Sequence, residues 1–228
     1  MHGAHLHIGG TAAIADPAGA LYLPDHRALL VADLHLEKAS AFAASGTMLP
    51  PYDSRQTLTL LDRLVRHYAP QAVYCLGDSF HDGDGPRRLD AVDGARLAKL
   101  TSGRRWIWIA GNHDGDAGLA WGGEAAVEIE LGRLVLRHAA TEGLDPIAEV
   151  SGHFHPKAAV RTRGRTITGR CFVTDGRRLI LPALGAFAGG LDVTDPAIAS
   201  LMAPRFQVFL MGRHRLAVFS RAQLLPPR

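Results

Sequence analysis

Short apolar runs recur along the chain, and polar turn residues separate them. Runs of this kind, bounded by Gly, Pro, Asn or Asp, are typical of β-strands. We predict strands at 20–23, 28–32, 72–76, 106–110, 127–131, 134–138, 147–151, 171–174, 178–181, 206–211 and 216–219. Short turns such as Asp175-Gly176 join several neighbouring runs, which favours antiparallel hairpins.

Helical spacing appears only in the first half of the chain. The segment 54–68 carries an apolar stripe at three- and four-residue spacing and predicts a helix, which Asp53 or Ser54 would cap. The segment 89–100 predicts a weaker helix, because Gly94 interrupts it. The first half therefore mixes strands and helices, whereas the second half is nearly all strand. This order favours an α/β fold of two packed sheets with helices outside.

Length and composition are compatible with one large domain. Of the 228 residues, 47% are hydrophobic and 21% are charged, which is enough for a sizeable core. The metal-binding motifs described below run from Asp33 to His155, so we expect residues 1–228 to fold as a single domain. The net charge is +3, from 25 Lys and Arg against 22 Asp and Glu, and it allows a polyanionic substrate.

The cellular compartment is predicted from what the sequence lacks. Cys75 and Cys171 are too few for a disulfide scaffold and lie in apolar runs, so each is expected to be buried. The sequence shows neither a signal-peptide pattern nor an apolar stretch as long as a membrane span. We therefore expect a cytoplasmic protein with no membrane partner. His2, His5 and His7 are expected in a frayed terminus or a first strand.

Five of the strand-like runs end directly in side chains that bind metals. These side chains are Asp33 and His35, Asp78, Asn112, His138, and His153 and His155. A set of carboxylates, an amide and imidazoles without thiolates suits two divalent ions such as Mn, Fe, Co, Ni or Zn. Open α/β sheets bind ligands at the carboxyl ends of their strands, so we expect these side chains to meet there.

Spacing within the motifs predicts which side chains face the ions. Residues i and i+2 of an extended segment point the same way, so Asp33 and His35 are expected on one side, and likewise His153 and His155. Asp78 is the lone acidic residue at its strand end and is the natural bridge between two cations. Two metals about 3.5–4 Å apart hydrolyse phosphate esters by in-line attack of a metal-bound hydroxide.

His113 and Asp114 are the candidate catalytic residues. His113 follows Asn112 and is expected at the rim, where it would stabilise the attacked phosphate or protonate the leaving oxygen. Asp114 would orient the His113 ring and favour its charged form. A purely structural histidine is the alternative for His113.

Basic residues follow the last motif and supply candidate substrate contacts. They are Lys157, Arg161, Arg163, Arg165 and Arg170. Singly they suggest a solvated loop or strand face, whereas as a group they suggest a contact with a phosphate backbone. We take Lys157, Arg161 and His81 as candidate substrate-binding residues; an ordinary loop position is the alternative for His81.

In this order, Asp-x-His, Gly-Asp, Gly-Asn-His-Asp, His and Gly-His-x-His resemble the motifs of the calcineurin-like metallophosphoesterase superfamily. The resemblance implies a four-layer α/β/β/α sandwich with two mixed sheets. It also implies two metal sites that share one ligand. One is formed by Asp33, His35, Asp78 and His155, and the other by Asp78, Asn112, His138 and His153. His113 would be the catalytic histidine.

The segments 31–38, 49–53 and 75–82 are similar to the bacterial ligase-associated DNA-damage-response phosphoesterases. That family is encoded beside an ATP-dependent DNA ligase, a helicase and an exonuclease. The resemblance implies manganese-dependent hydrolysis of DNA phosphodiesters, as an endonuclease or other nuclease in DNA repair. It would also place Glu37, Lys38, Tyr52 and Asp53 near the site.

Two other functions remain open from the residues alone. A phosphomonoesterase acting on nucleotides or small phosphates would use the same ligands and differ only around the site. A non-catalytic scaffold of the same fold is a third possibility, disfavoured because every motif is intact. The native metal, the endo or exo mode and the oligomeric state are not fixed, although the hairpin 206–219 offers an edge for pairing across a dimer.

Overall fold

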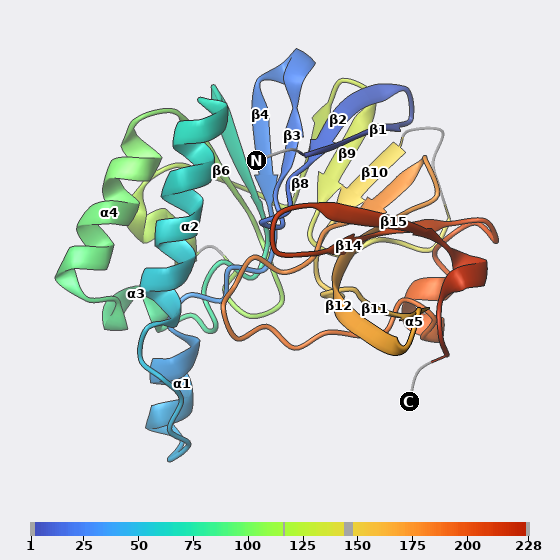
Figure 1. The fold of residues 1–228 in the computed structure, drawn as a ribbon. Helices are drawn as coiled ribbons and strands as arrows, with labels where there is room; N and C mark the ends of the chain where they lie inside the picture. The colour runs from blue at the N-terminus through green and yellow to red at the C-terminus, as the bar shows by residue number, and fades with distance from the viewer. Residues whose placement is uncertain (1–2, 116, 144–147, 227–228) are drawn as a thin grey trace.

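The computed structural model describes residues 3–115, 117–143 and 148–226. Two sheets pack face to face, with helices on their outer surfaces (Figure 1). His2 and Ile147, which belong to predicted elements, lie outside the described residues. The predicted α/β class and the four-layer α/β/β/α order are confirmed, although the fourth layer is thin.

The first sheet has seven strands in the order in which they occur in the chain. They are β1 Ala4–Ile8, β2 Thr11–Ala15, β3 Leu21–Leu23, β4 Ala28–Val31, β5 Ala72–Leu76, β6 Arg105–Ile109 and β7 Glu124–Ala126. The strands β1 to β4 are antiparallel, and β4 to β7 run parallel. The bounds of β5 are those predicted, and β1 confirms the first-strand interpretation of the N-terminal histidines; β2 and β7 were not predicted.

The second sheet has eight strands in the order β15-β14-β12-β13-β10-β9-β8, and β11 pairs with β12. Their bounds are β8 Glu128–Leu131, β9 Leu134–Arg137, β10 Ala148–Ser151, β11 Lys157–Thr162, β12 Arg165–Thr174, β13 Arg178–Ile180, β14 Gln207–Met211 and β15 Leu216–Ser220. The strands β9, β10 and β13 are parallel and the other pairs antiparallel, so this sheet is also mixed. The segment 157–170, interpreted either as a loop or as a strand face, is a hairpin.

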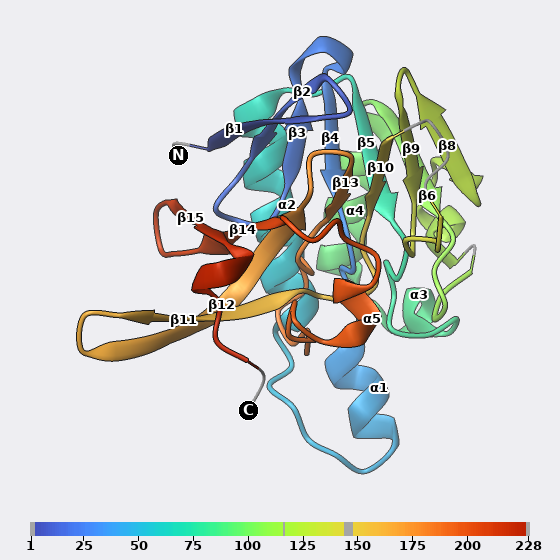
Figure 2. The same ribbon diagram turned by 90° about the vertical axis from the view of Figure 1, so that its right-hand side faces the viewer.

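The α-helices are α1 Lys38–Ala44, α2 Asp53–Tyr68, α3 Gly85–Arg88, α4 Ala91–Ser102 and α5 Pro196–Ala199; the 3-10 helices are η1 Pro24–His26, η2 Ala117–Trp121 and η3 Arg221–Gln223. The helices α2 and α4 lie on the outer face of the first sheet, and the short α5 lies beside the second sheet (Figures 1 and 2). The predicted helices at 54–68 and 89–100 are α2 and α4. The segment of α1 was expected to be a loop, but its alanines favour a helix.

The capping prediction for α2 is wrong. Its N-cap is Tyr52, and no side chain caps it. The Asp53 carboxylate instead accepts a hydrogen bond from the Ala39 amide at 3.0 Å, and the Ser54 hydroxyl donates to Glu37 at 2.7 Å. Both side chains hold α1 beside α2. Capping rules consider only neighbours in the sequence, so they do not predict these contacts.

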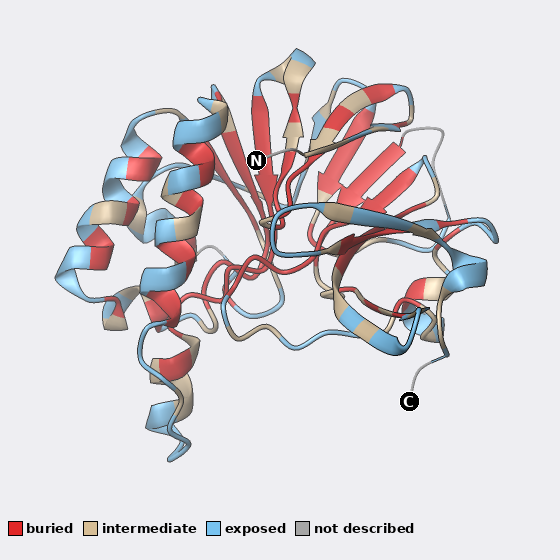
Figure 3. Ribbon diagram, in the orientation of Figure 1, coloured by how far each residue is buried: buried red, intermediate tan, exposed pale blue. Residues whose placement is uncertain are grey.

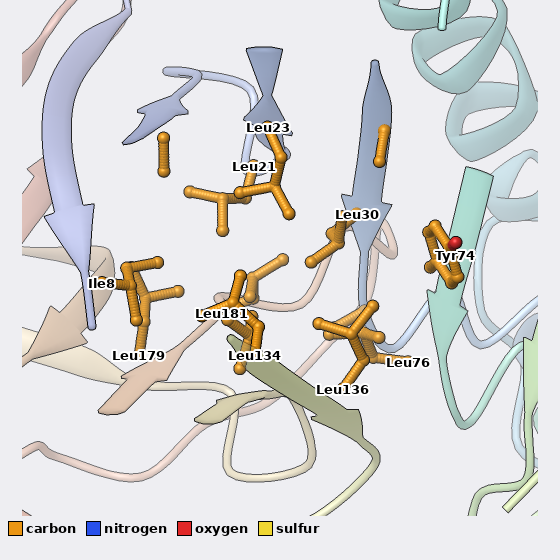
Figure 4. Close-up of a cluster of buried hydrophobic side chains, with 14 of the residues drawn as sticks. Ile8, Leu21, Leu23, Leu30, Tyr74, Leu76, Leu134, Leu136, Leu179 and Leu181 are labelled. Atoms are coloured by element: carbon orange, nitrogen blue, oxygen red, sulfur yellow. The ribbon is translucent and has the colours of Figure 1, made fainter. Parts of the chain in front are cut away.

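Three apolar clusters hold the layers together. Between the sheets, side chains such as Leu21, Leu30 and Leu76 face Leu136 and Leu179 (Figure 4). A second cluster lies between the first sheet and α2 and α4, and it includes both strand tryptophans. Each tryptophan is 1% exposed, so neither is available for stacking on a nucleobase. A third cluster covers the outer face of the second sheet.

Burial continues from the strands into the loops at their carboxyl ends (Figure 3). These loops are where the metal-type motifs lie. Since both sheets contribute to the core between them, one domain over residues 1–228 remains our prediction. Within the described parts of the chain, no helix has both the length and the apolar character required to cross a membrane.

Candidate functional site

The loops that follow β4, β5, β6, β9 and β10 bring the metal-type side chains together. Asp33, His35, Asp78 and His138 are buried, with at most 6% of each residue exposed. His153 and His155 are half-buried, and Asn112 is exposed at the rim. Residues from Asp33 to His155 thus meet at one end of the sandwich.

The ligand atoms form two groups. In each, the donor atoms lie within 4.8 Å of one another; the groups are Asp33, His35 and His155, and Asp78, His138 and His153. In the first group, His35 Nε2 lies 3.2 Å from His155 Nε2. In the second group, His153 Nδ1 lies 3.1 Å from His138 Nε2. Members of each group come from distant parts of the chain.

These donor sets fit two divalent cations. Imidazole nitrogens this close repel each other unless a proton or a cation lies between them. Burial, with the charge of His155 next, lowers the pKa of His35 to about 2, so its ring is held in the neutral form that binds metals. Burial followed by His138 lowers the pKa of His153 as well. Imidazole and carboxylate ligands suit Mn, Fe, Co, Ni and Zn alike, so the metal is not identified.

Asp78 belongs to the second group and also lies next to the first. Its Oδ2 is 3.6 Å from His138 Nε2 and 3.9 Å from His35 Nε2. Its other oxygen, Oδ1, accepts a hydrogen bond from the His113 amide at 3.1 Å. His138 is oriented by its Nδ1, which donates to the Leu76 carbonyl at 2.9 Å and leaves Nε2 facing the site. One carboxylate oxygen therefore lies within 4 Å of a histidine from each group.

The backbone of the motifs differs from the extended form assumed in the sequence argument. Asp33, His35, Asp78, His153 and His155 all have positive φ, between 44° and 71°. The same-side placement of Asp33 with His35 therefore comes from left-handed turns and not from strand alternation. Such residues cost about 1–3 kcal/mol each and persist only where the surroundings fix them.

Hydrogen bonds between the motif loops fix these turns. The Asp33 amide donates to the Gly77 carbonyl at 3.3 Å, and the His35 amide donates to the Asp78 carbonyl at 2.9 Å. The His153 amide donates to the Asp33 carboxylate at 3.0 Å. Since each loop is held by another, the strained conformations are determined before any ion binds.

Two glycines allow this close approach. A Cβ at Gly77 would clash with the His138 ring, and Gly77 also has a φ of 80°. A Cβ at Gly111 would clash with the amide nitrogen and carboxylate of Asp78. The glycine in each motif therefore lets the metal-type loops touch.

His113 lies where a catalytic residue is expected. Its side chain is 50% exposed, and its Nε2 is 3.9 Å from Asp78 Oδ2. The ring stacks on His81, with centroids 5.5 Å apart and planes at 16°. His81 also lies edge-on to His35 at 5.6 Å. The structure thus brings both His113 and His81 to the mouth of the site.

Asp114 does not have the expected contact. Its Oδ2 accepts hydrogen bonds from the amides of Ser79, at 2.5 Å, and Phe80, at 3.0 Å. Burial raises the pKa of Asp114, and these two amides oppose the shift. The orienting role toward the His113 ring is therefore not supported. Asp114 instead holds the turn that carries Asp78 against the loop that carries His113.

The three candidate substrate contacts lie at different distances from the ligands. His81 is within the site, and Lys157 is half-buried at the start of β11, two residues after His155. Arg161 is exposed further along β11 and is not part of the site itself. Lys38, which the resemblance placed nearby, is half-buried, and its ammonium lies 5.8 Å from the Phe42 ring centroid.

One contributor to the site was missed. The segment after β13 runs beside the first motif: the Leu184 amide donates to Ala32 and the Gly185 amide donates to Asp33, at 2.9 and 3.1 Å. Arg170 donates to the carbonyls of Ala183 and Gly185 at 2.9 and 3.3 Å. Arg170 is therefore an anchor for this segment and not the free phosphate contact that its neighbours suggested. The only sequence signal is a glycine after an apolar run.

Sequence and structure comparisons find relatives of this chain. A model described as calcineurin-like phosphoesterase matches residues 26–166. The crystal structure of nuclease MPE from Pseudomonas putida matches with a TM-score of 0.73 and 29% identity, covering 94% of this chain and 100% of that one. Yfce, a phosphoesterase from E. coli, matches with a TM-score of 0.44 and 15% identity over 85% of this chain and 98% of that one. No curated protein matches the chain.

Proposed function

Because the chain belongs to the calcineurin-like phosphoesterase family, we propose that it is a metal-dependent phosphodiesterase that cleaves DNA. The observation that carries the proposal is the pair of Asp and His groups, in which Asp78 of the second group lies next to the first. Similarity to a bacterial nuclease over 94% of the chain supports a nucleic-acid substrate. Manganese is the proposed metal.

The proposed ligands extend the two groups by the family resemblance, which adds Asn112 and shares Asp78 between the ions. One ion would be held by Asp33, His35, Asp78 and His155, and the other by Asp78, Asn112, His138 and His153. Two ions held in this way supply an activated water and positive charge at the phosphate oxygens.

The protein's own contribution is positioning and proton transfer. The buried carboxylates and neutral imidazoles are fixed by the loops described above. His113 is half-exposed, its Nε2 lies 3.9 Å from Asp78 Oδ2, and its ring centroid lies 5.5 Å from that of His35. We assign it to hydrogen-bond a substrate phosphate oxygen or to give a proton to the leaving oxygen. Asp114 would be a positioning residue, acting through the turn that carries Asp78.

The first experiment compares a nitrophenyl phosphodiester with its monoester. Chelator-treated protein would be refilled with manganese, and His113→Ala would be compared with His214→Ala, an exposed histidine in the turn between β14 and β15. We expect diester preference, and a loss of about 100-fold or more only in His113→Ala. Monoester preference would replace the proposal with a phosphatase, and no turnover of either substrate would favour a scaffold.

The biological setting is a further part of the proposal. We propose a role in DNA repair in the cytoplasm, with a functional link to an ATP-dependent DNA ligase and a helicase. It rests on the similarity of the motif segments to the ligase-associated family. A deletion strain should be more sensitive to DNA damage than its parent, and complementation with His113→Ala should not restore resistance. Equal sensitivity would count against the role.

A further inference from the structure

A cationic arm extends from the site. It is the hairpin formed by β11 and the first part of β12, residues 157–170, held by six cross-strand pairs from Lys157↔Arg170 to Thr162↔Arg165. Figure 2 shows it reaching well beyond the edge of the two sheets. The arm starts two residues after His155, so the chain leads directly from a ligand group into it.

All charged side chains of the arm are positive. It contains Lys157, Arg161, Arg163, Arg165 and Arg170, and no Asp or Glu. Arg161, Arg163 and Arg165 are exposed. The ion pairs formed within the described parts of the chain include none of these three arginines. Their charges are therefore available to an external anion.

The two faces of the arm differ. Directly paired residues of an antiparallel hairpin share a face. Val160 and Ile167 form one pair, and both pack against the third apolar cluster. Arg161 and Thr166 are paired on the opposite face, and both are exposed. One face thus holds the arm on the body, and the other presents cations and hydroxyl groups.

One carboxylate lies close to the polar face. A hollow of about 330 Å³ beside it is lined by Ala159, Thr166, Thr168, Asp192 and two C-terminal residues. The Asp192 carboxylate accepts hydrogen bonds from the amide and hydroxyl of Thr194, at 2.9 and 2.6 Å. These bonds hold it in place, and Asp192 forms no ion pair with an arm arginine among the described residues.

We propose that the cationic arm binds the sugar–phosphate backbone of a nucleic-acid substrate at a distance from the cleaved bond. The inference rests on the proposed function and adds a second contact region to it. Arginine contacts to phosphates position a nucleic acid without reading its sequence. The arm therefore favours long polynucleotides over short diesters.

The chain sets the scale of the substrate. Arg161 follows His155 by six positions. Extended chain rises about 3.3 Å per residue, so Arg161 lies at most roughly 20 Å from His155. Duplex DNA rises about 3.4 Å per nucleotide of one strand, so roughly six base pairs on one side of the cleaved bond span this distance. A duplex of about four base pairs is shorter than this span.

The test compares two sets of exposed arginines. The arm variant is Arg161→Ala/Arg163→Ala/Arg165→Ala, and the control, which removes the same charge from exposed positions elsewhere, is Arg205→Ala/Arg213→Ala/Arg215→Ala. The small nitrophenyl diester serves as the internal reference for each protein. We expect the ratio of the KM for a 40-base-pair duplex to the KM for the diester to be about tenfold higher in the arm variant than in the wild type. The same ratio for a four-base-pair duplex should not change. A KM shift equal to that of the control would overturn the proposal.

Binding without turnover separates this inference from the proposed function. Fluorescence anisotropy of the long duplex would be measured on chelator-treated protein over a range of salt. Each lost phosphate contact lowers the slope of log affinity against log salt by about one, so the arm variant should lose about three. Arg→Lys replacements at the three positions should restore most of the slope. An equal loss of binding to polyglutamate would reject nucleic-acid binding in favour of general anion binding. Failure of the wild type to hydrolyse any diester would overturn only the proposed function.

Discussion

The Nε2 atoms of His35 and His155 lie 3.2 Å apart, although the two residues are separated by 120 positions in the chain. Without a cation, nitrogens this close are tolerated only if one ring places its proton between them, which restricts both tautomers, whereas a bound cation satisfies both lone pairs. The folded protein should therefore be more stable with metal than without it.

Manganese should raise the Tm of chelator-treated protein. A ligand present at about 100 times its Kd adds about 2.7 kcal/mol, which corresponds to a rise of roughly 5–10 °C for a chain of this size. Asp78→Asn should abolish most of the rise, because Asp78 belongs to one group and lies next to the other. Asp25→Asn, an exposed carboxylate in η1, is the control and should keep it. The Tm of each protein would be measured by thermal unfolding with and without manganese. An unchanged Tm of the wild type would contradict metal binding to the folded protein.

Gly77→Ala should damage the site more than the fold. Both Gly77, with φ 80°, and Gly176, with φ 90°, have left-handed backbones, but only at Gly77 would a Cβ meet the His138 ring. Gly176→Ala should therefore lower the free energy of unfolding by only about 1 kcal/mol, the cost of backbone strain. Gly77→Ala should have this cost and should also bind less metal. Metal content after dialysis and denaturant unfolding would be measured on both. Equal metal content in the two variants would show that the His138 ring moves away from the new methyl group without weakening metal binding.

Asp114→Ala should lower kcat by displacing the turn that carries Asp78. It leaves the buried amides of Ser79 and Phe80 without an acceptor, which costs about 1–3 kcal/mol of unfolding free energy. Asp114→Asn keeps one acceptor oxygen and should recover part of both losses. The kcat and the free energy of unfolding would be measured for both variants. If Asp114 instead transfers a proton directly, Asp114→Asn should be as inactive as Asp114→Ala although it is more stable.

The buried ion pair of the second sheet should be a strong determinant of stability. Arg178 Nε donates to Glu149 Oε1 at 2.7 Å, and the two residues are 2% and 4% exposed. Arg178→Met should lower the unfolding free energy by about 3 kcal/mol, because the buried carboxylate then keeps only longer contacts, such as that with Arg137 Nε at 3.5 Å. The double variant Arg178→Met/Glu149→Leu should be less destabilised than the single one. Urea unfolding of the three proteins provides the comparison.

Both cysteines should resist alkylation in the native protein. Burial raises the pKa of the Cys75 thiol, with the charge of Asp114 contributing next, and burial also raises the pKa of Cys171. The thiolate is the reactive form, so iodoacetamide should label neither residue until the protein is unfolded. Mass spectrometry before and after denaturation would report this, and rapid native labelling of either cysteine would be inconsistent with its burial.

Local pattern predicted most of the regular elements. Continuous apolar runs gave β5 and β6 to within a residue, and the apolar stripe gave α2 to within a residue. Two of the missed elements carry no such run: α1 is built of small residues, and β11 carries charges. Both are stabilised by contacts with other segments, such as the bond from the Ala39 amide to Asp53.

The identities of the donor side chains were determined by the sequence itself, because each follows a strand whose apolar run is visible locally, as Asp78 follows β5. Tertiary structure alone decided how they meet. The 3.2 Å approach of His35 to His155, the left-handed turn at Asp33 and the partners of Asp114 all depend on contacts between segments far apart in the chain. No local pattern encodes such contacts, because they form only when both sheets and the loops at their ends have packed together.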